Sequence, residues 1–220
     1  MKKHIGKFIL MMLMMVSASA QAQIQAPAVT SGSAQSVPIA VSKFNPQKPE
    51  FNDLARDIPA IIARNLQSSG LFEPLNPNSF IQTPASIEAD QPRFGEWRAI
   101  NAQTLVSGTV TQTDDGRTRV EFRLWDVFSQ SQLTGMAYMT TPQNWRRIAH
   151  IISDEIYKRI TGEAGYFDTR VVYISESGTA QKRVKRLAIM DQDGKNHRYL
   201  TPAGELVLTP RFSPTAQEIT

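Results

Sequence analysis

The last quarter of the chain constrains the fold most, because four strand-like segments follow one another there without a helix between them. They are RVVYIS, RVKRLAIMD, HRYLT and ELVLTPRFS, at residues 170–175, 183–191, 197–201 and 205–213. Four short strands in one repeat of about 40–45 residues are typical of a β-propeller blade. The segment 166–220 is therefore predicted to be a first, truncated blade, and Gln217 would begin the next one. On this interpretation the chain is a fragment of a longer protein.

The other end of the chain has the pattern of a secretory signal peptide. An apolar run, FILMMLMMV, is followed by the small residues SASAQA and preceded by three lysines, Lys2, Lys3 and Lys7. This order is typical of a signal peptide. The run is shorter than the about 20 apolar residues that span a bilayer. We expect cleavage after Ala22, with Ala20 as the alternative, and no membrane insertion of the mature chain.

Charge and composition exclude several classes of function. Removal of the signal peptide, residues 1–22, takes away three lysines and no acid, so the net charge falls from +4 to about +1. The remaining basic residues are scattered, which argues against a nucleic-acid interface. The chain has no cysteine, so an ordinary hydrophobic core must hold an exported protein together without disulfides. Only His150 and His197 remain as histidines, which leaves few candidates for metal or nucleophilic sites.

The segment 37–165 alternates between strand and helix patterns. An apolar strand is predicted at 37–44, followed by a helix that Asp57 caps, with Pro59 in its first turn and Gly70 at its end. The proline-rich stretch 73–92 is predicted to be an extended connection, and a short helix is predicted at 95–103.

Three strands and a long helix complete this segment. The dipeptide Asp115-Gly116 indicates a hairpin between strands at 104–110 and 117–127, and a third strand is predicted at 133–141. A single apolar stripe in residues 142–162 predicts a helix, and its members are Trp145, Ile148, Ala149, Ile152, Ile156 and Ile160. The order predicts an α/β (α+β) domain, a mixed sheet with helices packed on it.

Two motifs resemble functional sites without matching them. Asp191-Gln192-Asp193-Gly194 shares letters with calcium loops, but the spacing of an EF-hand is absent, and a turn between two strands is the better interpretation. His150 and Asp154 lie four positions apart on the predicted helix, where a local hydrogen bond is a simpler explanation than an acid–base pair. Trp97, Trp125 and other periodic aromatic residues are expected in the core. The sequence therefore predicts no catalytic, cofactor-binding or metal site.

Several stretches carry a family resemblance. PIAVSKF, DIPAIIARNLQSSGLFEPL, LVSGTVTQTDDGR, AHIISDEIYKRITGEAGYFDTRVVYIS and LAIMDQDGKNHRYLT together resemble the TolB family, periplasmic proteins of the bacterial Tol-Pal system. The resemblance implies an N-terminal α/β domain followed by a six-bladed propeller, of which one blade is present here. It also implies a non-enzymatic interaction protein without cofactors that links TolA to the lipoprotein Pal. Such proteins support outer-membrane integrity and constriction during cell division.

Residues 23–36 read as a flexible N-terminal arm, because they are small and polar with little to bury. The family resemblance places a TolA-binding segment, the TolB box, in this arm. By position its residues would be Ile24, Gln25, Val29, Thr30, Ser31, Gly32 and Ser33. Pal would dock on the propeller, mostly beyond Thr220.

Two further expectations follow from the sequence. The alternative function is the N-terminal part of an exported propeller hydrolase whose catalytic domain is missing. Because a propeller blade relies on its neighbours to cover its faces and edges, we expect residues 37–165 to fold independently. The segment 170–220 is expected to be frayed or prone to aggregation.

Overall fold

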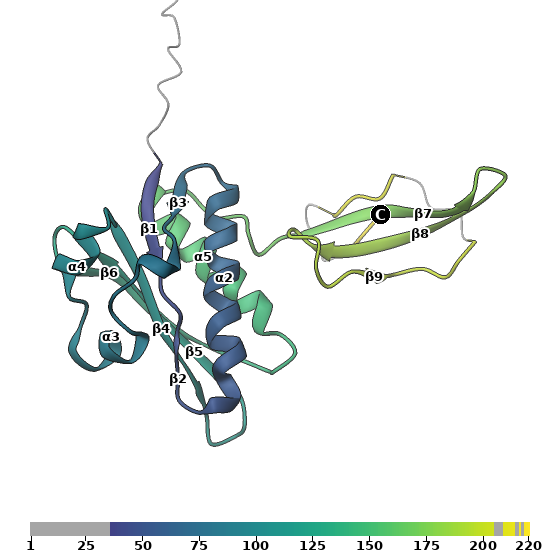
Figure 1. Ribbon diagram of the computed structural model, residues 1–220. Helices are drawn as coiled ribbons and strands as arrows, with labels where there is room; N and C mark the ends of the chain where they lie inside the picture. Colours follow the sequence, from purple (N-terminus) through teal and green to yellow (C-terminus); the bar gives the residue numbers. More distant parts are fainter. Residues whose placement is uncertain (1–35, 205–208, 214–215, 217) are drawn as a thin grey trace, which may run out of the picture. The chain divides into compact units, whose positions relative to one another are not determined.

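The computed structural model describes residues 36–204, 209–213, 216 and 218–220 (Figure 1). These residues belong to one compact unit, Gln35–Thr220. The predicted signal peptide with its cleavage site at Ala22, and the arm with the seven predicted partner-binding residues, lie outside the described residues.

The described elements follow a mixed order of strands and helices. They are β1 (Val37–Val41), β2 (Asn45–Pro46), η1 (Pro49–Phe51), α2 (Asn52–Ser68), β3 (Phe72–Pro74), η2 (Pro77–Ser79), α3 (Pro84–Asp90), α4 (Phe94–Ala99), β4 (Thr104–Gln112), β5 (Thr118–Asp126), β6 (Ser131–Thr140), α5 (Trp145–Thr161), β7 (Arg170–Thr179), β8 (Lys182–Asp191) and β9 (Arg198–Tyr199).

The first sheet has the strand order β3-β1-β4-β5-β6, and β2 also pairs with β4. The strand β1 pairs parallel with β3 and β4, and β2 pairs parallel with β4, whereas β4, β5 and β6 form an antiparallel meander. The predicted mixed sheet and the Asp115-Gly116 hairpin are both confirmed. Gly116 stands at φ 81° in that turn, in the left-handed region that glycine adopts without strain.

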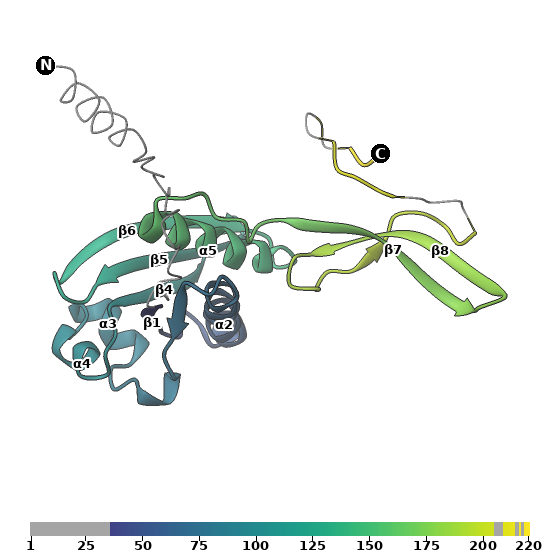
Figure 2. The same cartoon turned by 90° about the horizontal axis from the view of Figure 1, so that it is seen from above.

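Helices cover both faces of this sheet. The helices α2 and α5 lie side by side (Figures 1 and 2) and pack with β1, β4 and β5 in the larger core cluster, which includes Ile62, Phe122 and Ile152. Side chains alternate between the two faces along a strand. Ala40 of β1 and Leu105 of β4 therefore point to the face of the sheet opposite α2 and α5. They lie in a second cluster with Ile87, Trp97 and Trp125, formed with α3 and α4. The predicted apolar stripe of α5 and the predicted core positions of Trp97 and Trp125 are confirmed.

The start of α2 differs from the prediction. The helix begins at Asn52, so Asp57 does not cap it and Pro59 lies in its interior. A proline inside a helix lacks the N–H that would bond to the carbonyl four residues earlier. Here that carbonyl, on Ala55, accepts the backbone N–H of Phe44 at 2.9 Å. A partner from another part of the chain therefore satisfies the group that the proline leaves free.

The stretch 73–92 also differs from the prediction, because it contains the helix α3. Pro84 occupies the first turn, where no N–H is needed, and the Thr83 side chain accepts the N–H of Ser86. The buried Gln82 side chain fixes the adjoining loop. Its Oε1 accepts the indole N–H of Trp97 at 3.0 Å and a backbone N–H at 2.9 Å.

Residue 108 shows why the central sheet needs a glycine there. Phe44 lies in the segment between β1 and β2, and its aromatic ring packs against Gly108 of β4. A Cβ at this position would lie 2.3 Å from the backbone oxygen of Glu121 and 3.1 Å from the Phe44 ring. Any larger residue would therefore push β4 away from β5 or from the ring.

The second sheet consists of β7, β8 and β9 in that order, paired antiparallel. It confirms three of the four predicted strands, without a helix between them. Residues 205–208, which would begin the fourth predicted strand, lie outside the described residues. Phe212 and Ile219 form an isolated antiparallel bridge. The division of the chain at residues 165 and 166 into two domains stays a prediction.

Candidate functional site

A group of polar side chains, three of them buried, joins α2, α5 and the turn that follows β8. We call Asn65, His150, Ser153, Gln192 and Asp193 the polar junction. Asn65, His150 and Ser153 are 3%, 2% and 0% exposed. Buried polar groups destabilise a fold unless they are hydrogen-bonded, so the bonds within this group decide its role.

Asn65 is the centre of the polar junction. Its Nδ2 donates to Ser153 Oγ at 2.9 Å and lies 2.9 Å from His150 Nδ1. Its Oδ1 accepts Gln192 Nε2 at 3.1 Å. Ser153 Oγ donates to the backbone oxygen of Ala149, which leaves a lone pair for Asn65. One amide thereby connects two helices with the turn after β8.

His150 faces Asp193 on its other side. His150 Nε2 lies 4.0 Å from Asp193 Oδ2, which Arg146 also contacts in an ion pair. Burial lowers the pKa of the His150 imidazole, and the carboxylates of Asp193 and Asp191 oppose this only in part. The neutral ring is therefore favoured at neutral pH.

The Asp191–Gly194 motif is a turn between β8 and β9, as predicted. The N–H of Gly194 donates to the carbonyl of Asp191 at 2.9 Å, and Gly194 has φ 79°. The Asp191 carboxylate accepts Asn196 Nδ2. This turn brings Asp191 and Asp193 towards α5, which their positions in the sequence did not indicate.

Asp154 has a different role from the predicted one. It does not bond to His150; its two oxygens accept the backbone N–H groups of Phe167 and Asp168 at 2.6 and 3.0 Å. A Cβ at Gly165 would lie 2.3 Å from Asp154, so the backbone approaches α5 closely. The prediction of a local helix bond was wrong because the carboxylate points to the segment after the helix, which no local pattern specifies.

Phe167 holds the same segment by apolar contact. Its ring is 0% exposed and lies 5.8 Å from that of Tyr157, centroid to centroid. Arg147 forms an ion pair with the neighbouring Asp168 at 3.1 Å. The connection between the two sheets is therefore fixed to α5 by a carboxylate, a buried ring and an ion pair.

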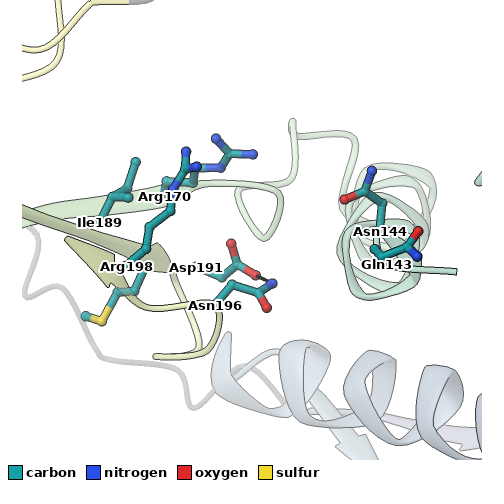
Figure 3. A pocket seen from close by; sticks show the side chains of 8 residues that line it. Gln143, Asn144, Arg170, Ile189, Asp191, Asn196 and Arg198 are labelled. Carbon is teal, nitrogen blue, oxygen red and sulfur yellow. Dashed lines mark hydrogen bonds between the residues drawn. The ribbon is translucent and has the colours of Figure 1, made fainter. Parts of the chain in front are cut away.

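A polar pocket of about 260 Å³ opens between the start of α5 and the end of β8 (Figure 3). Gln143 and Asn144 line it from the start of α5, and Asp191 and Asn196 line it from the turn after β8. Arg170 and Arg198 reach into the same region from β7 and β9. The lining offers hydrogen-bond donors and acceptors rather than an apolar surface.

The remaining carboxylates and the exposed histidine form no catalytic group among the described residues. Asp115 bonds with Thr113 and Arg117 inside its own hairpin. His197 is exposed, and its ring packs against Tyr199. In the part of the chain that the structure describes, no helix is long and apolar enough to cross a membrane.

Comparisons with known proteins agree with this arrangement. The model of the TolB amino-terminal domain matches residues 28–133, and the model of the TolB beta propeller domain matches residues 157–220. The chain belongs to the TolB family. The TolB matches confirm the predicted fold of an α/β domain followed by the start of a propeller.

Individual TolB proteins show how much of the family architecture the chain spans. This chain is 54% identical over 192 residues to the Tol-Pal system protein TolB of Paramagnetospirillum magneticum. The aligned region covers 87% of this chain and 43% of that protein. The crystal structure of TolB from Acinetobacter baumannii matches with a TM-score of 0.66 and 27% identity, covering 84% of this chain and 43% of that one. The chain thus spans less than half the length of these relatives.

Proposed function

We propose that the chain acts as a non-enzymatic interaction protein of the Tol-Pal system in the periplasm. The observation that carries this proposal is the 54% identity to a Tol-Pal system protein TolB. The lack of a catalytic group among the described residues is compatible with it. In this role the protein links TolA to Pal and so supports outer-membrane integrity and constriction during division.

The proposed contact with TolA lies in the arm, residues 23–36. An extended segment without regular structure of its own can add a strand to the edge of a partner's sheet, where backbone hydrogen bonds supply the affinity. The same arm can also fold back on its own domain. Pal docks on the propeller, and a partner bound there biases the balance between the free and the docked arm by a few kcal/mol.

The proposal divides the work between two parts of the chain. Residues 37–165 serve as the scaffold that carries the arm, and residues 166–220 begin the propeller. The buried ring of Phe167 and the hydrogen bonds that Asp154 accepts support a fixed connection between these two parts. Such a connection suits a protein that has to coordinate two partners at separate surfaces.

Deletion of the arm tests the proposal. The mature chain, residues 23–220, and a variant that starts at Val37 are compared in a pull-down with TolA. The deletion is expected to abolish binding and to leave the melting temperature unchanged, because the small, polar residues of the arm offer little apolar surface to bury. A variant with a Gly/Ser sequence of equal length in place of 23–36 serves as the matched control for length. TolA binding that survives both changes would remove the arm from the mechanism.

A further inference from the structure

The structure places His150 next to two carboxylates that lie far from it in the sequence. His150, Asp191 and Asp193 each offer one ligand atom, and these atoms all lie within 4.8 Å of one another. We propose that the three side chains bind a divalent transition-metal ion of the zinc type. One imidazole nitrogen and two carboxylate oxygens suit this ion, and water completes the usual four-fold coordination.

His150 points to a ligand independently of the carboxylates. The residue is 2% exposed, and its Nε2 has no hydrogen-bond partner among the described residues. A buried polar atom without a partner destabilises the fold, and a metal ion would satisfy it. A cavity of about 60 Å³ reaches His150 and Asp191, which is room for an ion with a bound water.

Asn65 supplies the supporting contact that a metal-bound histidine needs. When Nε2 binds an ion, the neutral ring carries its proton on Nδ1, which then donates to an acceptor. In the structure Nδ1 lies 2.9 Å from the amide nitrogen of Asn65. A half-turn of the Asn65 amide puts Oδ1 there instead, and Ser153 Oγ then turns its proton from the Ala149 oxygen to this Oδ1. A half-turn of Gln192 preserves the bond between the two amides. The metal-bound ring thus needs no partner at Nδ1 other than Asn65.

Arg146 competes with the ion for Asp193. Its guanidinium is ion-paired with Oδ2, the oxygen that lies 4.0 Å from His150 Nε2. A cation must displace this arginine and draw the three ligands closer, since zinc–ligand bonds of about 2.0–2.2 Å place neighbouring ligand atoms about 3.4 Å apart. Loss of the Arg146 charge should therefore tighten metal binding. If the cluster is only an ion-pair network, the same change would not create affinity for metal.

Calorimetric titration of the tag-free mature chain, residues 23–220, with zinc chloride tests the proposal. One saturable site is expected at zinc concentrations below about 1 mM. Asp193→Asn should weaken binding at least tenfold, and Arg146→Gln should strengthen it about tenfold. His197→Gln removes the other histidine of the mature chain and should leave binding unchanged, as should Asp114→Asn in the exposed hairpin turn.

Two further variants and one spectrum separate the outcomes. His150→Gln should abolish binding; circular dichroism checks its fold, and Asp191→Asn tests the same site without altering the core. Cobalt in place of zinc should give the absorption bands of a four-coordinate site in the wild type and should not give them in His150→Gln. Absence of saturable binding in the folded wild type, binding that survives Asp193→Asn, or weaker binding by Arg146→Gln would overturn the proposal.

Discussion

The contact between Asp154 and the segment after α5 leads to a quantitative prediction. The carboxylate accepts two backbone N–H groups, from Phe167 at 2.6 Å and from Asp168 at 3.0 Å. Hydrogen bonds to a charged group contribute about 1.5–3 kcal/mol each. Asp154→Asn keeps one acceptor oxygen but turns an N–H₂ group towards the second backbone N–H. The variant should therefore lose about 2–3 kcal/mol of local stability.

Hydrogen exchange of the amides of Phe167 and Asp168 measures this loss directly. A loss of about 2–3 kcal/mol corresponds to roughly 30- to 150-fold faster exchange when opening is local. The control is Asp114→Asn, the same chemical change in the exposed turn of the first hairpin, which should leave both amides unchanged. Exchange at Phe167 and Asp168 that is equally slow in Asp154→Asn would refute the reasoning, because the carboxylate would then not hold the segment.

Two core positions give further predictions. Gly108→Ala should lower the free energy of unfolding by about 3 kcal/mol, because its Cβ would lie 2.3 Å from the Glu121 backbone oxygen; a urea titration with an unchanged midpoint would contradict this. Trp97→Phe removes the donor to Gln82 Oε1 and should lower the same quantity by about 1–2 kcal/mol. Gln82→Met should lower the free energy of unfolding by more than Trp97→Phe does, because Gln82 Oε1 also accepts a backbone N–H, which the methionine would leave without a partner.

Periodic apolar residues predicted most elements correctly, since the packing of a face follows directly from spacing. Ile148, Ile152 and Ile156 recur at helical intervals and are buried in α5. The start of α2 could not be predicted from its own residues. Its interior proline is tolerated because the Ala55 carbonyl bonds to Phe44, and a contact from outside the helix leaves no local signal.

The polar junction shows the same limit at the candidate site. Asn65 lies in a helix whose pattern marks only its apolar neighbours, and its partner His150 lies 85 positions further on. Nothing near Asn65 in the sequence indicates that its amide will be buried between two helices and the turn after β8. The turn itself was predicted because Asp-Gly pairs act locally. Its approach to His150 depends on tertiary structure and was not predicted.

The central claim is that this TolB-family chain binds its partner through the arm and uses the folded part as a scaffold. Nuclear magnetic resonance of the ¹⁵N-labelled mature chain, titrated with a soluble part of TolA, tests it most directly. The account predicts that resonances of residues 23–36 shift or broaden while those of 37–165 stay in place. Changes confined to 37–165, with the arm resonances unaffected at saturation, would contradict it.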